Sequence, residues 1–263
     1  MQKNTWELCV TPIISHSCGI PGMHGSGFFL SYKDDVFLVT ARHCLGKLQT
    51  DWEELIQSLL ISVNPLGAGE EINAATKIVF ESLFIAKSES NQDDYLGDKD
   101  GDMDLAFLKV SQANALHFQS VSSRAYTFVH HPKLEEIIEE NRPKERFVLI
   151  GWPTEVGGAE IDYEANGAKL SNAKLMGIYD GKGQYPHTHK LTVTDQGGIV
   201  DFNGFSGSPI FAKVPTPEPN KFHHIFIGMV ICGRSDSNTL EYIHQTVIFE
   251  QLSIFIKTNR ASI

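Results

Sequence analysis

The sequence has few cysteines, and their spacing excludes the common cysteine-based sites. Its four cysteines are Cys9, Cys18, Cys44 and Cys232, and none belongs to a Cys-x-x-Cys motif. Disulfide-rich secreted domains need a dense framework of cysteines, which this spacing does not provide. We therefore expect a reducing, cytoplasmic environment.

Long apolar runs and an excess of basic residues are also missing. No stretch approaches the length of a membrane span. Residues 1–15 include Lys3 and Glu7 and lack the apolar run of a signal peptide. The chain has 22 basic and 32 acidic residues, a net charge of −10. Such a field repels phosphate backbones and anionic lipid surfaces, so we expect neither a nucleic acid nor a membrane as a partner.

What the sequence does contain is a series of short β-type segments. The chain has 263 residues, of which 41% are hydrophobic, as expected for a globular protein. Residues 10–14, 25–30 and 36–40 are predicted strands, and the polar residues 33–35 make the last two a hairpin. Residues 72–84 predict one or two more strands. An amphipathic helix is expected over residues 52–60.

The second half continues this pattern after a connector at residues 111–146, which includes a charged helix at 133–141. Six strand segments are predicted there: 147–150, 168–178, 191–194, 209–213, 224–231 and 240–248. Three prolines make residues 215–220 a hairpin loop, and the apolar spacing of residues 249–257 predicts a C-terminal helix.

The segment Gly-Phe-Ser-Gly-Ser-Pro at 204–209 is the strongest candidate for chemistry. Two glycines around a serine allow a tight loop in which consecutive backbone N–H groups converge on one point, where they can bind an oxyanion. Ser206 lies at the centre of that loop. Its hydroxyl would therefore lie beside the donors, as acyl transfer requires.

Other segments accompany it in a fixed order. Thr-Ala-Arg-His-Cys at 40–44 ends a buried strand, Asp-Leu-Ala-Phe-Leu-Lys at 104–109 begins another, and the serine loop follows. This set resembles the trypsin-like (chymotrypsin-fold) serine peptidases. The segment 148–153 is similar to a strand end of bacterial members such as glutamyl endopeptidases and the HtrA group, and 227–233 resembles the strand that lines their cleft.

The resemblance implies an all-β fold of two packed, six-stranded antiparallel Greek-key barrels with a C-terminal helix. The N-terminal barrel would occupy residues 1–115 and carry His43 and Asp104. Residues 116–263 would form the connector, the C-terminal barrel with Ser206, and the helix. Together they would make one peptidase domain.

The same resemblance implies the role of each site residue. Ser206 would be the nucleophile, His43 its base and Asp104 the carboxylate that orients the imidazole, although Asp102 precedes the same strand and competes for that role. The N–H groups of Gly204 and Ser206 would form the oxyanion hole. The substrate-binding walls would be Ile199, Val200, Asp201, Ile231, Cys232, Gly233 and Leu240. A small, apolar or basic residue is expected before the scissile bond.

No cofactor or metal is expected. The acidic loop at 88–102 lacks the glycine and glutamate of an EF-hand when counted from Asp98. Three histidine groups, at 130–131, 187–189 and 223–224, have no cysteine or carboxylate partner at zinc-like spacing, so we interpret them as surface or loop residues.

The sequence thus predicts a prokaryotic, cytoplasmic serine endopeptidase that acts on proteins or peptides. Phe205 stands where secreted digestive members have an aspartate, so activation by a newly cut N-terminal amine is not expected. We hypothesise control by a regulatory protein partner or by target availability. The alternative is a catalytically silent fold that binds peptides. An esterase-like α/β-hydrolase requires the reverse order of triad residues.

Overall fold

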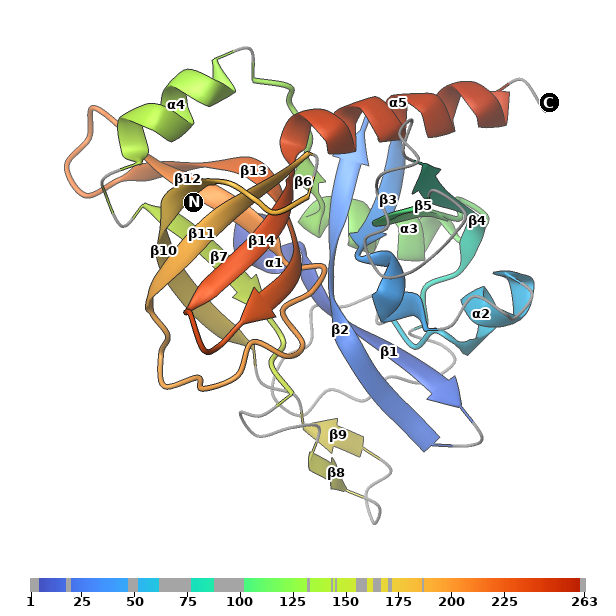
Figure 1. The fold of residues 1–263 in the computed structure, drawn as a ribbon. Helices are drawn as coiled ribbons and strands as arrows, with labels where there is room; N and C mark the ends of the chain where they lie inside the picture. Colours follow the sequence, from blue (N-terminus) through green and yellow to red (C-terminus); the bar gives the residue numbers. More distant parts are fainter. Residues whose placement is uncertain are drawn as a thin grey trace.

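The computed structural model describes most of the chain. The described residues are 5–17, 20–46, 52–61, 77–87, 102–131, 133–142, 144, 146–154, 160–162, 167–169, 172–185 and 187–260. Figure 1 shows two β units side by side, with a long C-terminal helix across one end of the molecule.

The N-terminal unit is a six-stranded sheet with the order β1-β2-β3-β5-β4, to which β6 adds by pairing with β2. Its strands are β1 (Val10–Ser17), β2 (Ile20–Tyr32), β3 (Asp35–Thr40), β4 (Phe80–Lys87), β5 (Asp102–Val110) and β6 (Tyr126–Thr127). The central strand β3 is rich in β-branched and aromatic residues, which suit a buried, pleated surface, and its neighbour β5 has a run of apolar residues from Leu105 to Leu108. All pairings in this sheet are antiparallel except β2 with β6, which is parallel.

The C-terminal unit is a closed antiparallel barrel with the strand order β10-β11-β14-β13-β12-β7. Its strands are β7 (Phe147–Gly151), β10 (Ala173–Lys182), β11 (Thr188–Asp195), β12 (Pro209–Pro215), β13 (Phe222–Arg234) and β14 (Thr239–His244). A separate small hairpin comprises β8 (Glu160–Asp162) and β9 (Gly167–Lys169).

Short helices fill the connections, and one long helix ends the fold. They are α1 (Thr5–Leu8), the 3-10 helix η1 (Arg42–Leu45), α2 (Trp52–Ser58), α3 (Ala115–Arg124), α4 (Leu134–Asn141) and α5 (Gln245–Arg260). The apolar side of α5 packs on the N-terminal sheet, where Phe255 contacts Phe37 and Phe84. No helix among the described residues is both long and apolar enough to cross a bilayer.

The two units share a hydrophobic core. The rings of Phe28 in β2 and Phe226 in β13 lie 5.2 Å apart, and Tyr126 in β6 packs on Phe211 in β12. A second cluster fills the inside of the barrel around Phe147, among other apolar side chains. Because the first cluster crosses from one unit to the other, loops from both units are held together at their junction.

The structure confirms an all-β fold of two six-stranded units with a C-terminal helix. The predicted hairpins at 25–40 and around 215–220, and the helices at 52–60 and 133–141, are present with small changes of boundary. The predicted domain boundary at 115/116 stays a prediction. The strand β6, which follows that boundary, nevertheless pairs with β2 before it.

Several element predictions were wrong in detail. The connector contains α3, which was not predicted, and residues 168–178 hold parts of both β9 and β10 instead of one strand. Residues 245–248 begin α5 and do not extend β14. Of the predicted segment 72–84, the described part contributes to β4, while residues 72–76 lie outside the described residues.

Candidate active site

The sheet register explains why His43 and Asp104 meet. In the antiparallel pair β3–β5, Thr40 lies opposite Ala106, so residues beyond Thr40 approach those before Ala106. His43 follows within η1, where the chain turns after β3. Asp104 is the third residue of β5 and is buried. The two side chains therefore meet where β3 ends.

Asp104 holds His43 through both carboxylate oxygens. The imidazole Nδ1–H of His43 donates to Asp104 Oδ2 over 2.7 Å, and the backbone N–H of His43 donates to Oδ1 over 3.0 Å. These two bonds fix both the orientation and the tautomer of the ring, with Nε2 left for other chemistry. The His43 side chain is 37% exposed, so the ring is not sealed inside the fold.

The pair also changes the proton affinity of the imidazole. Burial disfavours the charged ring, but the hydrogen bond to Asp104, with a smaller contribution from Cys44, outweighs burial and raises the pKa of His43 to about 10. The folded chain therefore holds this proton more tightly than the unfolded chain does. The resulting stabilisation is complete below pH 6.5 and is lost as the pH rises towards 10.

Ser206 lies in a tight loop that requires glycine on both sides. Gly204 and Gly207 have φ angles of +93° and +86°, which side chains rarely adopt. Gly207 also packs so closely on β2 that a Cβ atom there would collide with the carbonyl oxygen of Ser26. The N–H of Gly207 donates to Val230 O over 2.7 Å, which ties the loop to β13.

We expect Gly207→Ala to destabilise the fold by at least about 2 kcal/mol, because a left-handed backbone costs about 1–2 kcal/mol and the collision adds to it. Gly46→Ala is a matched control. Its φ of +88° is nearly the same, but its Cβ would have open space. Urea denaturation should show a larger loss for Gly207→Ala, and equal losses would contradict the role of close packing.

The hydroxyl of Ser206 has a different partner from the imidazole. Ser206 Oγ donates to the carbonyl oxygen of Ile231 over 3.0 Å. The carbonyl oxygen of Ser206 accepts from the Ser26 N–H at 2.8 Å and lies 3.5 Å from the thiol of Cys44, the neighbour of His43. The structure thus brings the serine loop against the histidine segment, with the hydroxyl turned to β13.

The two backbone N–H groups predicted to form the oxyanion hole have no hydrogen-bond acceptor among the described residues. Within the described part of the chain, neither the N–H of Gly204 nor that of Ser206 donates a hydrogen bond to another residue, whereas the N–H groups of Phe205, Gly207 and Ser208 all do. Unpaired N–H groups in a tight loop can bind a developing negative charge. This geometry suits an oxyanion hole.

No protein-family model and no curated protein matches this chain. The two β units are compatible with a chymotrypsin-like fold. Any functional assignment therefore depends on the geometry of the site itself.

Ser26 is a further residue of the site that the sequence analysis missed. Its Oγ donates to Gly204 O over 2.7 Å and accepts from the Trp152 N–H over 2.9 Å. Its backbone N–H donates to Ser206 O, and its carbonyl accepts from the Thr40 hydroxyl. Ser26 therefore joins β2 to the serine loop. The only signal in the sequence was the small-residue segment Gly25-Ser26-Gly27.

The predicted substrate walls divide into packed and exposed groups. Ile199, Ile231 and Leu240 are buried, Cys232 is half-buried, and Val200 is 77% exposed. The side chains of Ile199 and Leu240 thus belong to the core, and Val200 faces solvent.

The space beside Gly233 is small. A Cβ atom on Gly233 would lie 2.5 Å from Phe202 Cβ and 2.8 Å from Leu240 Cδ2, so these two side chains fill it. Asp201 accepts hydrogen bonds from the Asn203 N–H and the Ser235 hydroxyl, which makes it a loop-fixing residue. Phe202 and Leu240 therefore already occupy the space beside Gly233, and Asp201 is held by its own loop.

Of the histidines predicted to lie on the surface or in loops, His130, His187 and His223 are exposed, whereas His131, His189 and His224 are half-buried. His224 stacks on Trp6 with ring centroids 4.2 Å apart, and His189 on β11 stacks on His244 at 4.7 Å. Burial lowers the pKa values of all three histidines, to about 4 for His224 and His244. Among the described residues, no group of three or more metal-ligating side chains occurs.

The acidic loop and the cysteines lie only partly within the described residues. Of the acidic loop, residues 88–101 lie outside the described residues, and Asp102 begins β5. Cys9, Cys44 and Cys232 form no disulfide with one another, and Cys18 lies outside the described residues.

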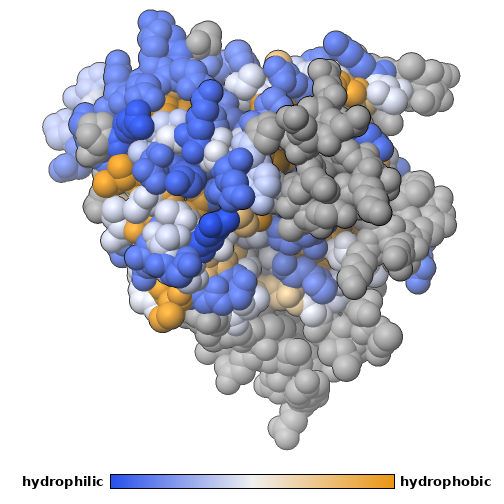
Figure 2. All heavy atoms as spheres, in the orientation of Figure 1, coloured by the Kyte–Doolittle hydropathy of each residue, from blue (hydrophilic) through white to orange (hydrophobic). Residues whose placement is uncertain are grey.

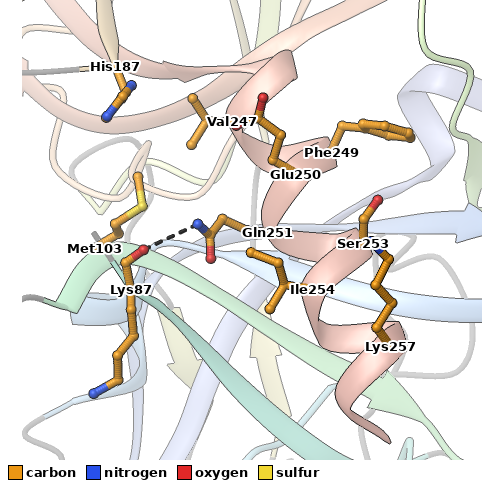
Figure 3. A pocket seen from close by; sticks show the side chains of 10 residues that line it. All are labelled: Lys87, Met103, His187, Val247, Phe249, Glu250, Gln251, Ser253, Ile254 and Lys257. Atoms are coloured by element: carbon orange, nitrogen blue, oxygen red, sulfur yellow. Dashed lines mark hydrogen bonds between the residues drawn. The ribbon is translucent and has the colours of Figure 1, made fainter. Parts of the chain in front are cut away.

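A cavity of about 510 Å³ lies beside α5 and is separate from the serine and histidine loops. Figure 3 shows Lys87 and Met103 on one side of it and helix residues such as Gln251 and Ile254 on the other. The side chain of Gln251 donates to the carbonyl oxygen of Lys87 over 3.2 Å. None of His43, Asp104 and Ser206 lines this cavity.

Proposed function

We propose that the chain is a serine endopeptidase that hydrolyses peptide bonds through an acyl-enzyme. The observation that carries the proposal is the pair of hydrogen bonds between His43 and Asp104. This pair lies beside the serine loop, in which two backbone N–H groups have no acceptor among the described residues. These are the groups that acyl transfer needs: a base with a fixed tautomer, a nucleophile and an oxyanion site.

Each residue would have a defined step in the reaction. Ser206 Oγ attacks the peptide carbonyl carbon while His43 Nε2 takes its proton, and Asp104 stabilises the imidazolium. The carbonyl oxygen becomes an oxyanion at the N–H groups of Gly204 and Ser206. His43 then gives the proton to the departing amine, which breaks the C–N bond. A water molecule then attacks the acyl-enzyme with His43 again as the base, and the acyl group leaves Ser206 as a carboxylic acid.

The nucleophile must turn before it can react. Its hydroxyl donates to Ile231 O, and a rotation about the Cα–Cβ bond would direct it to His43. Phe205 is fully buried, so the position before Ser206 supplies no charge for an activating ion pair. We propose that a bound substrate or a regulatory protein partner favours the turned hydroxyl, and that the chain works in the cytoplasm.

A catalytically silent peptide-binding protein is the second candidate. The Ser206 hydroxyl is bonded to Ile231, and a protonated His43 at neutral pH cannot accept a proton, which both favour this alternative. Reaction with a fluorophosphonate distinguishes the two candidates. Labelling at Ser206 that disappears in His43→Ala supports the peptidase. Absence of labelling across pH 6–10 would reject it.

The raised pKa of His43 predicts an alkaline enzyme. Only the neutral imidazole can act as the base, so kcat/KM should rise with pH above 6.5, about tenfold per unit, until the pKa of His43 is reached near 10. A pH–rate profile measured with a peptide substrate tests this directly. A profile already level at pH 7 would show that His43 loses its proton more easily than its contacts indicate.

A further inference from the structure

One edge of β13 is not covered by any described strand where it passes Ser206. On its β12 side, the strand pairing of β13 ends at Met229, opposite Pro209, and backbone hydrogen bonds to Gly207 and Ser208 continue to Val230. On its other side it stays paired with β14 as far as Arg234. Among the described strands, none pairs with residues 231–234 along the β12 edge. The open edge begins at Ile231, whose carbonyl oxygen holds the Ser206 hydroxyl.

A cavity of about 340 Å³ lies beside the far end of this edge. Six of its lining side chains matter here: the cations Lys182, Lys190 and Arg234, the hydroxyls of Ser237 and Thr239, and the carboxylate of Glu241. Cys232 lies opposite Glu241, and Arg234 opposite Thr239, so these residues share one face of the sheet. The open edge therefore leads directly to the cavity.

The charge of the cavity is opposite to that of the protein. Three cations face one carboxylate here, although the whole chain carries −10. The carboxylate is already used inside the fold, because Glu241 Oε2 accepts from the Gln184 N–H at 3.1 Å and from the Thr188 hydroxyl at 3.3 Å. An anionic side chain would meet the only strongly cationic concavity described next to this edge.

Two of the three cations, Lys182 and Arg234, are available to a ligand, whereas Lys190 already has a carboxylate partner. Lys182 is exposed and makes no ion pair with any described residue. Arg234 is exposed and donates to the neutral amide of Gln184 over 2.8 Å, and Lys190 lies 3.6 Å from Asp180 at the surface. Figure 2 shows many hydrophilic side chains, with some apolar patches between them, on the barrel half of the molecule.

We infer that the chain selects peptides with an acidic side chain on the acyl side, about two to four residues before the bond that is cut. This inference rests on the proposed peptidase function. His43 gives its proton to the departing amine from the N-terminal unit, so the acyl half of a peptide lies along the barrel and β13. Three residues of strand span about 10 Å, the length from Ile231 to Arg234.

The test compares acidic side chains with their neutral amides. A randomised peptide mixture is digested and the cleaved positions are read by mass spectrometry. Glu and Asp should be enriched over Gln and Asn by about twofold to fivefold in kcat/KM at the second to fourth positions before the cut, as expected for one exposed ion pair. The enrichment should fall as salt is added.

The test variant combines Lys182→Ala and Arg234→Ala. Its control is Lys257→Ala, which removes a surface cation on α5, away from this cavity. The double variant should lose the acidic preference with little change in kcat for neutral peptides, while the control keeps it. Equal cleavage of acidic and amide peptides by the unmodified chain, or a preference that survives in the double variant, would overturn the inference.

A binding measurement separates this inference from the proposed function. A fluorescein-labelled hexapeptide with two adjacent glutamates, and its twin with two glutamines, are titrated against the Ser206→Ala chain by anisotropy. Tighter binding of the acidic peptide, lost in the Lys182→Ala and Arg234→Ala background, supports the cavity even if fluorophosphonate never labels Ser206. Labelling of Ser206 without any acidic preference would leave the peptidase intact and reject the cavity's role.

Discussion

Ser206→Ala should lower kcat for peptide hydrolysis by about a million-fold, because the nucleophile and its base act as one unit and the loss of either removes the covalent pathway. The variant should still hydrolyse the peptide faster than the uncatalysed reaction in water, because peptide binding and the oxyanion donors remain. The measurement is single-turnover cleavage of a labelled peptide at pH 9, where His43 is closer to its neutral form.

The control for this change is Ser253→Ala, which removes a hydroxyl from α5. It should keep full activity. Ser206→Ala loses its hydrogen bond to Ile231, so a decrease of about 1 kcal/mol in the free energy of unfolding is expected, too little to explain the kinetic loss. Unchanged hydrolysis by Ser206→Ala would end the assignment of this serine as nucleophile.

Asp104→Asn should lower kcat by about ten-thousand-fold while the chain stays folded. A neutral amide no longer requires a proton on Nδ1 of His43, so the ring adopts the wrong tautomer for taking the serine proton. The change also removes the charge that raises the pKa of His43, which should move down towards 6.5.

Two readouts separate this effect from simple unfolding. NMR titration of the His43 ring should show the lower pKa, and the alkaline rise of any residual activity should move to lower pH. Asp34→Asn, in the exposed turn before β3, is the control and should change neither. A His43 pKa that stays high in Asp104→Asn would show that Asp104 is not its main partner.

Most of the strands could be predicted from the sequence, because their signal lies in short local patterns of apolar residues. The apolar segments gave most strands, because pleated, buried surfaces select β-branched and aromatic residues. The order of the histidine, aspartate and serine segments led to the pair of His43 with Asp104, which the register of β3 and β5 brings together.

Features that depend on tertiary packing were not predictable in the same way. Thr246, Val247 and Ile248 suggest a strand, yet they begin α5, because Ile248 is buried in the core and packing outweighs weak propensity. Helix α3 has only a few apolar residues, so the helical periodicity of its hydrophobic positions is weak. The bond from Ser206 to Ile231 joins residues 25 positions apart and has no local signature.

Ser26 has a consequence for the life of the chain on the ribosome. It binds the loop of Ser206 from a strand made about 180 residues earlier, and Ile231 binds the same serine from a strand made later. A nascent chain that ends before β13 contains Ser26 but lacks both the Ile231 carbonyl that holds the Ser206 hydroxyl and the edge of β13 beside it. For the proposed peptidase, the last contact that holds the serine would therefore form only when nearly all of the chain has been synthesised.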